Sequence, residues 1–274
     1  MSPLLSNKVA DTFFDRFGIL PKESSQDFLW EIGEAFSHLP FENLTKLLKK
    51  HRGLPNAEWR RMPDEVLADH LSLGTGGTCF ALTNFFQTVL RTAGYYCRPV
   101  MCDMRNEKNV HCAVIIQLKQ SLLLMDPGFL LHQPILLQPG RTSECNTGVA
   151  DVRLVGDPTG KTYELFTGDT WRYRMKIAEV PPEKFLSFWD ASFNWGMMNG
   201  IHLSRAVDGG YTYVHGNKLR LQKRQTKENL NIRGIEEQVI AERFGIDPKV
   251  VKQAYALVKG IRQNSPKTAE SSNE

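Results

Sequence analysis

The spacing of the apolar residues changes near residue 95, and this change most restricts the folds that are open to the chain. Residues 28–36 place large apolar side chains four positions apart, which is the spacing of an amphipathic helix. Residues 111–118 and 121–127 are instead rich in Val, Ile and Leu and flank the turn Lys119-Gln120, like the strands of a hairpin. We therefore expect an α+β fold in which a small helical bundle precedes a β-rich region.

Composition and charge limit the classes of function. The 274 residues carry a formal net charge of +4, which suits an anionic small ligand but is too small to indicate a nucleic-acid-binding surface. Neither an export signal nor an apolar run of membrane-spanning length is visible, so we expect a cytoplasmic protein without membrane contact. The five cysteines include no CxxC pair, which favours free thiols and predicts no metal site.

One of the five cysteines has a setting that favours ionisation. The run Gly76-Gly77-Thr78-Cys79 places this thiol at the start of a predicted helix, where unpaired N–H groups and the helix dipole stabilise an anion. Such a position lowers a thiol pKa, and the glycines would let an acyl group approach and add amides to an oxyanion hole. Cys79 is therefore a candidate nucleophile. The competing interpretation is a small buried core residue.

The predicted hairpin brings a histidine and an aspartate together. If Lys119-Gln120 is a two-residue turn, Leu118 faces Ser121 and Ala113 faces Asp126. His111 then lies diagonally across from Asp126 on the same face, within reach of a side-chain hydrogen bond. A carboxylate that orients an imidazole is typical of nucleophilic catalysis. Taken singly, Asp126 also fits a turn at a strand end, and His111 a half-exposed strand residue.

Four segments together resemble the arylamine N-acetyltransferases in order and spacing, and the likeness spans nearly the whole chain. They are LPFENL at 39–44, GGTCF at 76–80, His111, and DPGF at 126–129. The resemblance implies a helical bundle over residues 1–94, a β-barrel-like domain over 95–205, and an α/β lid over 206–274. Within the last part, the residues themselves predict a helix that starts at Asp247-Pro248 and a polar, disordered tail over the last dozen residues.

The same resemblance implies a reaction and a set of residues. Acetyl-coenzyme A, a co-substrate that is not permanently bound, would acetylate Cys79, with His111 and Asp126 as its catalytic partners. An arylamine, hydrazine or N-hydroxyarylamine would then accept the acetyl group. Phe41 and Phe129 match positions that line the acceptor pocket, although both also suit an apolar core.

The chain departs from the family pattern around the cysteine. The family usually has Arg, Glu and Asn where this chain has Thr75, Ala81 and Thr83. If the family's Arg and Glu form a buried ion pair, losing both together avoids an unpaired charge. We interpret this as a divergent subgroup whose donor and acceptor are open.

A late run of basic residues is a candidate for binding the phosphates of the donor. Lys218 and Arg220 are its leading members, followed by Lys223, Arg224 and Lys227. Positive charge of this kind binds phosphate, although most such runs are solvated surface.

Three other functions stay open at this point. One is an amide synthase of the same fold that takes an acyl chain from a carrier protein. Another is a papain- or transglutaminase-like hydrolase, which shares the Cys, His, Asp order. The third is a non-catalytic relative that has kept the fold, which the changes at Thr75 and Ala81 would suit.

Overall fold

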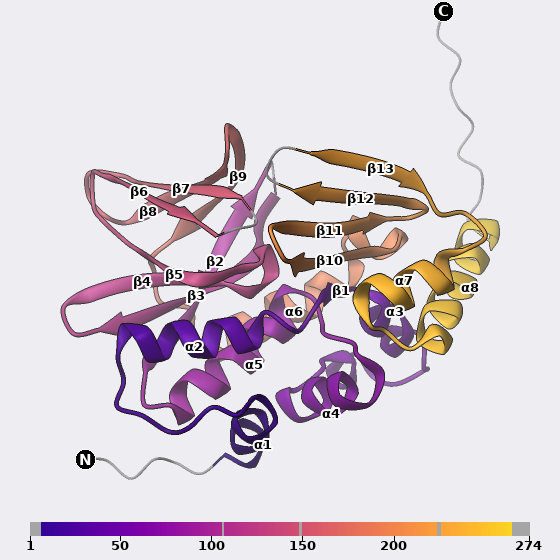
Figure 1. Ribbon diagram of the computed structural model, residues 1–274, viewed down its shortest axis with the longest axis horizontal. Helices are drawn as coiled ribbons and strands as arrows, with labels where there is room; N and C mark the ends of the chain where they lie inside the picture. The colour runs from indigo at the N-terminus through magenta and orange to yellow at the C-terminus, as the bar shows by residue number, and fades with distance from the viewer. Residues whose placement is uncertain (1–6, 106, 148–149, 224–225, 265–274) are drawn as a thin grey trace, which may run out of the picture.

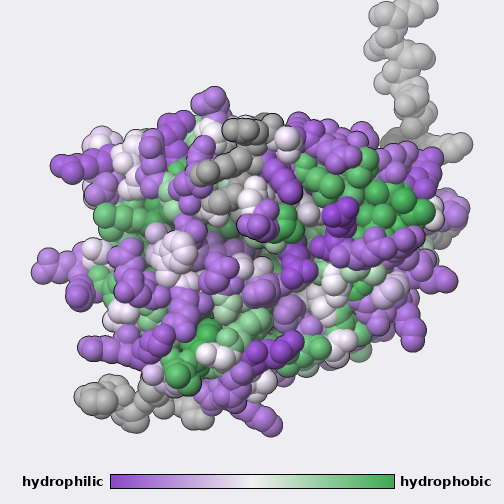
Figure 2. Space-filling view, in the orientation of Figure 1, coloured by the Kyte–Doolittle hydropathy of each residue, from purple (hydrophilic) through white to green (hydrophobic). Residues whose placement is uncertain are grey.

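The computed structural model describes residues 7–105, 107–147, 150–223 and 226–264 (Figure 1). Arg224 and most of the predicted disordered tail therefore lie outside the described residues. The first two residues of that tail, 263 and 264, end the last helix. In the view of Figure 1 the N-terminal helices lie below two antiparallel sheets that lie beside each other, and the C-terminal helices lie at the right, next to the second sheet. Hydrophilic residues cover most of this face, and hydrophobic residues show between them (Figure 2).

The first third of the chain is helical, as the apolar period predicts. Its helices are α1 (Lys8–Phe17), α2 (Gln26–Phe36), α3 (Leu44–Lys50), α4 (Pro63–Leu73) and α5 (Cys79–Thr92). Phenylalanines from α1, α2 and α5 meet in the core, where the Phe36 ring lies 5.3 Å from Phe85 and 4.7 Å from Phe86. Packing of these tilted rings fixes α5, which carries the candidate nucleophile, against the bundle.

The middle of the chain forms an eight-stranded antiparallel sheet in the order β5-β4-β3-β2-β9-β8-β7-β6. Its edge strands β5 and β6 are in contact, so the sheet is a nearly closed barrel. The strands are β2 (Tyr96–Met104), β3 (Glu107–Leu118), β4 (Ser121–Asp126), β5 (Leu131–Leu136), β6 (Thr142–Asn146), β7 (Asp151–Gly156), β8 (Thr162–Thr167) and β9 (Thr170–Lys176).

A second sheet joins the C-terminal region to the start of the chain. Its order is β1-β10-β11-β12-β13, so the short strand β1 (Phe41–Glu42) pairs with a strand about 160 residues later. The other members are β10 (His202–Val207), β11 (Gly210–His215), β12 (Lys218–Lys223) and β13 (Lys227–Asn231). The helices of this half are α6 (Pro182–Ala191), α7 (Glu236–Phe244) and α8 (Pro248–Asn264), which begins where Asp247-Pro248 predicts.

The fold class is the predicted one: α+β, with a helical bundle, a barrel-like sheet and an α/β region. The division at residues 94 and 205 stays a prediction. Within the described ranges, no helix combines the length and apolar character needed to cross a membrane.

Candidate active site

The β3–β4 hairpin has the register that the sequence predicts. Leu118 pairs with Ser121, and the pairing continues to Val114 and Met125. His111 and Asp126 lie just beyond, where His111 Nε2 is 2.7 Å from Asp126 Oδ2. Both side chains are buried, with 3% and 0% of their surface exposed. The expected diagonal contact between the two side chains is therefore confirmed.

Asp126 is held at both carboxylate oxygens. Besides its contact with His111, it accepts a hydrogen bond at Oδ1 from the Phe129 N–H at 3.2 Å, which starts the 3-10 turn η2 (Pro127–Phe129). The Phe129 ring meets the His111 ring edge to face, with centroids 5.0 Å apart. The Tyr173 ring lies 5.1 Å from the same imidazole. The histidine is thus fixed by one hydrogen bond and two aromatic neighbours.

Cys79 is the first residue of α5, as the glycine turn predicts. The preceding residue, Thr78, makes no side-chain hydrogen bond to the first turn of α5. The backbone N–H groups of that turn are therefore not capped by the Thr78 side chain. Gly128 shows how near the thiol and imidazole are: a Cβ there would lie 2.9 Å from both Cys79 Cβ and His111 Cε1. The absence of a side chain at Gly128 lets the two groups approach each other.

The electrostatic surroundings of Cys79 and His111 favour a thiolate beside an imidazolium. A hydrogen bond from the Cys112 thiol lowers the pKa of Cys79, burial opposes this, and the contact with His111 brings the pKa well below its usual value. Burial alone would lower the pKa of His111, but the Asp126 carboxylate and the Cys79 thiolate outweigh it and raise that pKa to about 10. Both shifts favour an ionised sulfur beside a protonated ring.

Lys46 and Cys112 also act on the thiol, although the sequence did not single them out. Lys46 is buried on α3, where its ammonium donates to Ser192 O at 2.9 Å and to Ser192 Oγ at 2.6 Å. Burial lowers the pKa of Lys46 to about 8, and its charge helps to lower the pKa of Cys79. A cysteine in a strand and a lysine in a short helix carry no pattern that marks them as neighbours of residue 79.

The remaining predicted site residues lie at different distances from this centre. Phe129 touches His111, and the Phe41 backbone forms a β-bridge with Gly77, two residues before Cys79. Lys218 and Arg220 lie on β12, three strands away from β1 in the second sheet. Strand spacing puts β12 about 14 Å from β1, so the structure does not bring these two residues to the thiol.

The glycine amides differ from the expectation in one respect. The Gly77 N–H donates to Pro40 O at 3.3 Å, and the Gly77 carbonyl accepts from Glu42 N at 3.0 Å. Gly77 therefore serves to join the turn to β1, and its amide is not free for an oxyanion hole. In the part of the chain that the structure describes, no group of three or more His, Cys, Asp or Glu side chains is arranged to hold a metal ion.

Comparison with known proteins places this chain in a family. A family model described as N-acetyltransferase matches residues 29–252. The chain therefore belongs to the arylamine N-acetyltransferase family, and it is an enzyme of the transferase class. A search of the curated proteins found no match.

Solved structures agree with this assignment at the level of the fold. The arylamine N-acetyltransferase of Mycobacterium marinum is 20% identical, with a TM-score of 0.74 over 92% of this chain and 99% of that one. The enzyme of Nocardia farcinica is 17% identical, with a TM-score of 0.74 over 91% and 95%. One from Bacillus cereus is 20% identical, with a TM-score of 0.70 over 88% and 100%, and is described as having a Cys-His-Glu catalytic triad. This chain has an aspartate beside its histidine.

Proposed function

We propose that this enzyme moves an acetyl group from acetyl-coenzyme A to an arylamine, hydrazine or N-hydroxyarylamine by a ping-pong mechanism through acyl-Cys79. The observation that carries the proposal is the buried Asp126–His111 contact of 2.7 Å beside a thiol at the start of α5. An oriented imidazolium next to a thiolate is the arrangement that nucleophilic catalysis by cysteine needs.

In the first half-reaction, the Cys79 thiolate attacks the thioester carbonyl of the donor. The carbon–sulfur bond to coenzyme A breaks, and the His111 imidazolium gives its proton to the leaving thiolate. Nδ1 is the ring nitrogen for this transfer, since Nε2 is bound to Asp126. The products are acetyl-Cys79, neutral His111 and free coenzyme A.

In the second half-reaction, the amine nitrogen attacks the acetyl-Cys79 carbonyl. Neutral His111 takes a proton from the nitrogen, and the carbon–sulfur bond to Cys79 breaks. The amide leaves, and the thiolate–imidazolium pair is restored. Asp126 stabilises the ring whenever it is charged, and because it is buried with two hydrogen bonds it keeps one orientation through both steps.

We assign the acceptor to the side of the thiol next to Phe129 and Phe41, and the donor phosphates to Lys218 and Arg220. Aromatic walls suit a flat arylamine, and cations suit the phosphates of coenzyme A. Acetyl-coenzyme A enters and leaves as a co-substrate. The cytoplasmic location stays a prediction.

Intact-protein mass spectrometry tests the covalent step. The protein mixed with acetyl-coenzyme A without amine should gain one acetyl group, which peptide mapping places on Cys79 and hydroxylamine removes. Cys145→Ser, which changes the most exposed of the five thiols, should gain it as well, whereas Cys79→Ser should not form the thioester.

The other functions predict different results. If acetyl-coenzyme A leaves no adduct on Cys79 while iodoacetamide still labels that thiol, acetyl-coenzyme A is not the donor. Transfer only from an acyl carrier protein would favour the amide synthase. Steady release of acetate without amine would favour the hydrolase, and an ordinary thiol pH profile at Cys79 would favour the non-catalytic relative.

A further inference from the structure

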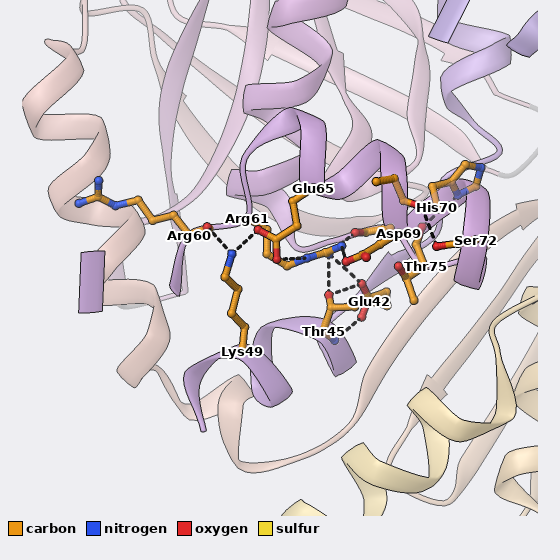
Figure 3. Close-up of polar contacts among 12 residues, drawn as sticks. Glu42, Thr45, Lys49, Arg60, Arg61, Glu65, Asp69, His70, Ser72 and Thr75 are labelled. Carbon is orange, nitrogen blue, oxygen red and sulfur yellow. Dashed lines mark hydrogen bonds and ion pairs between the residues drawn. The ribbon is translucent and has the colours of Figure 1, made fainter. Parts of the chain in front are cut away.

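Arg61 is a buried cation next to the turn that carries Cys79 (Figure 3). Only 3% of its surface is exposed, and it lies two residues before the start of α4. Its Nη1 donates to Gly76 O at 2.5 Å and to Thr45 Oγ1 at 2.6 Å, and its Nη2 donates to Asp69 Oδ2 at 2.8 Å. One guanidinium therefore joins the glycine turn, α3 and α4.

The same guanidinium offsets the buried charge of Glu42. This carboxylate has no exposed surface and accepts from Thr45 N at 3.0 Å and from Thr45 Oγ1 at 2.6 Å. Arg61 Nη1 lies 3.5 Å from Glu42 Oε1. A buried carboxylate needs such a partner, because removing one charge of a buried pair leaves the other desolvated and uncompensated.

The glycine turn is enclosed between β1 and this cation. On one side, Gly77 forms the β-bridge with Phe41, and a Cβ at Gly76 would overlap the Pro40 carbonyl oxygen. On the other side, a Cβ at Gly77 would lie 3.7 Å from Arg61 Nη1, and Gly76 O accepts the Arg61 hydrogen bond. The two residues before Thr78 are therefore held from both sides.

We propose that Arg61 is a positioning residue for Cys79: by binding Gly76 O and Glu42 together, it fixes the turn from which α5 starts and so holds the sulfur against His111. This inference rests on the proposed function, in which Cys79 is the nucleophile. A displacement of about 1 Å at a reacting group is enough to cost roughly a hundredfold in rate, so a contact three residues from the sulfur matters.

The position of this cation also explains a departure in the sequence. Thr75 stands where the family usually has an arginine, and it is fully buried. Among the described residues, Thr75 Oγ1 has no hydrogen-bond partner. Arg61 reaches the same turn from a segment 14 residues earlier, so the buried cation is supplied by another part of the chain.

Three variants separate positioning from simple neutralisation of Glu42. Arg61→Lys keeps the charge, but an ammonium cannot bind Gly76 O, Thr45 and Asp69 in the fork geometry of a guanidinium. Arg61→Met removes the charge as well. Arg60→Met is the matched control, since Arg60 pairs with Asp190 through two hydrogen bonds of 2.7 and 2.6 Å and does not bind the turn.

The decisive measurement is the pH profile of Cys79 alkylation by iodoacetamide, which needs no substrate. Well below the unfolding temperature of each variant, Arg61→Lys should react at least about tenfold more slowly at pH 7, with its profile shifted towards that of an ordinary thiol. Its kcat should fall by a similar factor with little change in KM for acetyl-coenzyme A. Arg60→Met should stay within about twofold of the wild type.

A wild-type alkylation profile in Arg61→Lys would overturn the inference, whatever happens to KM, and this variant decides the matter if Arg61→Met does not fold. An ordinary thiol profile in the wild-type protein would instead overturn the proposed function. The two failures are therefore distinguishable.

Discussion

The β3–β4 hairpin and the Arg61 cluster both position the site, but they differ in how their residues come together. The Arg61 cluster is Arg61 with the groups that it binds, which belong to Glu42, Thr45, Asp69 and Gly76. His111 and Asp126 are 15 residues apart on neighbouring strands, and one turn sets their register. Arg61, Glu42 and Gly76 come from three segments joined by loops and helices, and no periodic pattern relates them. A contact that backbone register determines can be predicted by counting residues, whereas a contact between separately packed segments needs the tertiary fold.

The largest effect should come from breaking the hairpin contact. Asp126→Asn removes one of two accepting oxygens and the charge that raises the pKa of His111. The His111 pKa should fall, the imidazolium should be lost at lower pH, and the Cys79 pKa should rise as a result. We expect kcat to fall by about 10²–10⁴, measured by steady-state acetylation of an arylamine.

The pH dependence of this variant checks the sign of the effect. Alkylation of wild-type Cys79 should remain fast well below pH 8, because its pKa is lowered and His111 keeps its proton up to a pH of about 10. In Asp126→Asn the profile should move to alkaline pH. Asp151→Asn, on the exposed part of β7, is the control and should match the wild type. A profile unchanged by Asp126→Asn would show that the carboxylate does not support the imidazolium.

The elements of the fold that could be predicted are those that a few neighbouring residues determine. The start of α5 at Cys79, the turn at Lys119-Gln120 and the start of α8 at Pro248 each follow from a few adjacent residues. The pairing of β2 with β9 within the barrel joins segments about 70 residues apart, and the pairing of β1 with β10 joins segments about 160 residues apart. No local pattern specifies either pairing.

The candidate site divides in the same way. The contact between His111 and Asp126 followed from register, and Phe129 was found through a family motif. Lys46, Cys112 and Tyr173 approach the centre from α3, β3 and β9, and their side chains are ordinary members of apolar or basic runs in the sequence. Only packing shows that they share one neighbourhood.

Gly128 tests whether the hairpin and α5 must be in close contact. In Gly128→Ala the new Cβ would lie 2.9 Å from both Cys79 Cβ and His111 Cε1, so the thiol and the ring must move apart. A shift of this size should lower kcat by about 10- to 100-fold in the same arylamine assay. Gly260→Ala, where nothing lies within 4 Å, is the control. Equal activity of the two variants would mean that the site accommodates a methyl group without moving the sulfur.

A change at Thr45 tests the Arg61 cluster through the hydroxyl that lies between Arg61 and Glu42. Thr45→Val removes a hydroxyl that donates to Glu42 and accepts from Arg61, and it leaves both buried charges with one partner fewer. The free energy of unfolding, measured by urea denaturation, should fall by about 1–3 kcal/mol. Thr12→Val, on the exposed face of α1, should change it by less than about 0.5 kcal/mol. A neutral Thr45→Val would show that the guanidinium and carboxylate pair adequately without the hydroxyl.

The smallest effect should come from the basic strand β12, which is the part of the proposal furthest from the thiol. Lys218→Ala/Arg220→Ala should raise KM for acetyl-coenzyme A by about two- to fivefold at low salt and leave kcat nearly unchanged. Lys218 is exposed and Arg220 is half-buried, and charges so near the solvent attract phosphate weakly and are screened. Lys249→Ala/Lys252→Ala removes the same charge from α8 and separates a local contact from a change in net charge. Equal KM values for the two double variants would limit the donor site to residues nearer Cys79. A rise specific to the β12 variant would instead extend the site to β12, which neither the hairpin nor the Arg61 cluster reaches.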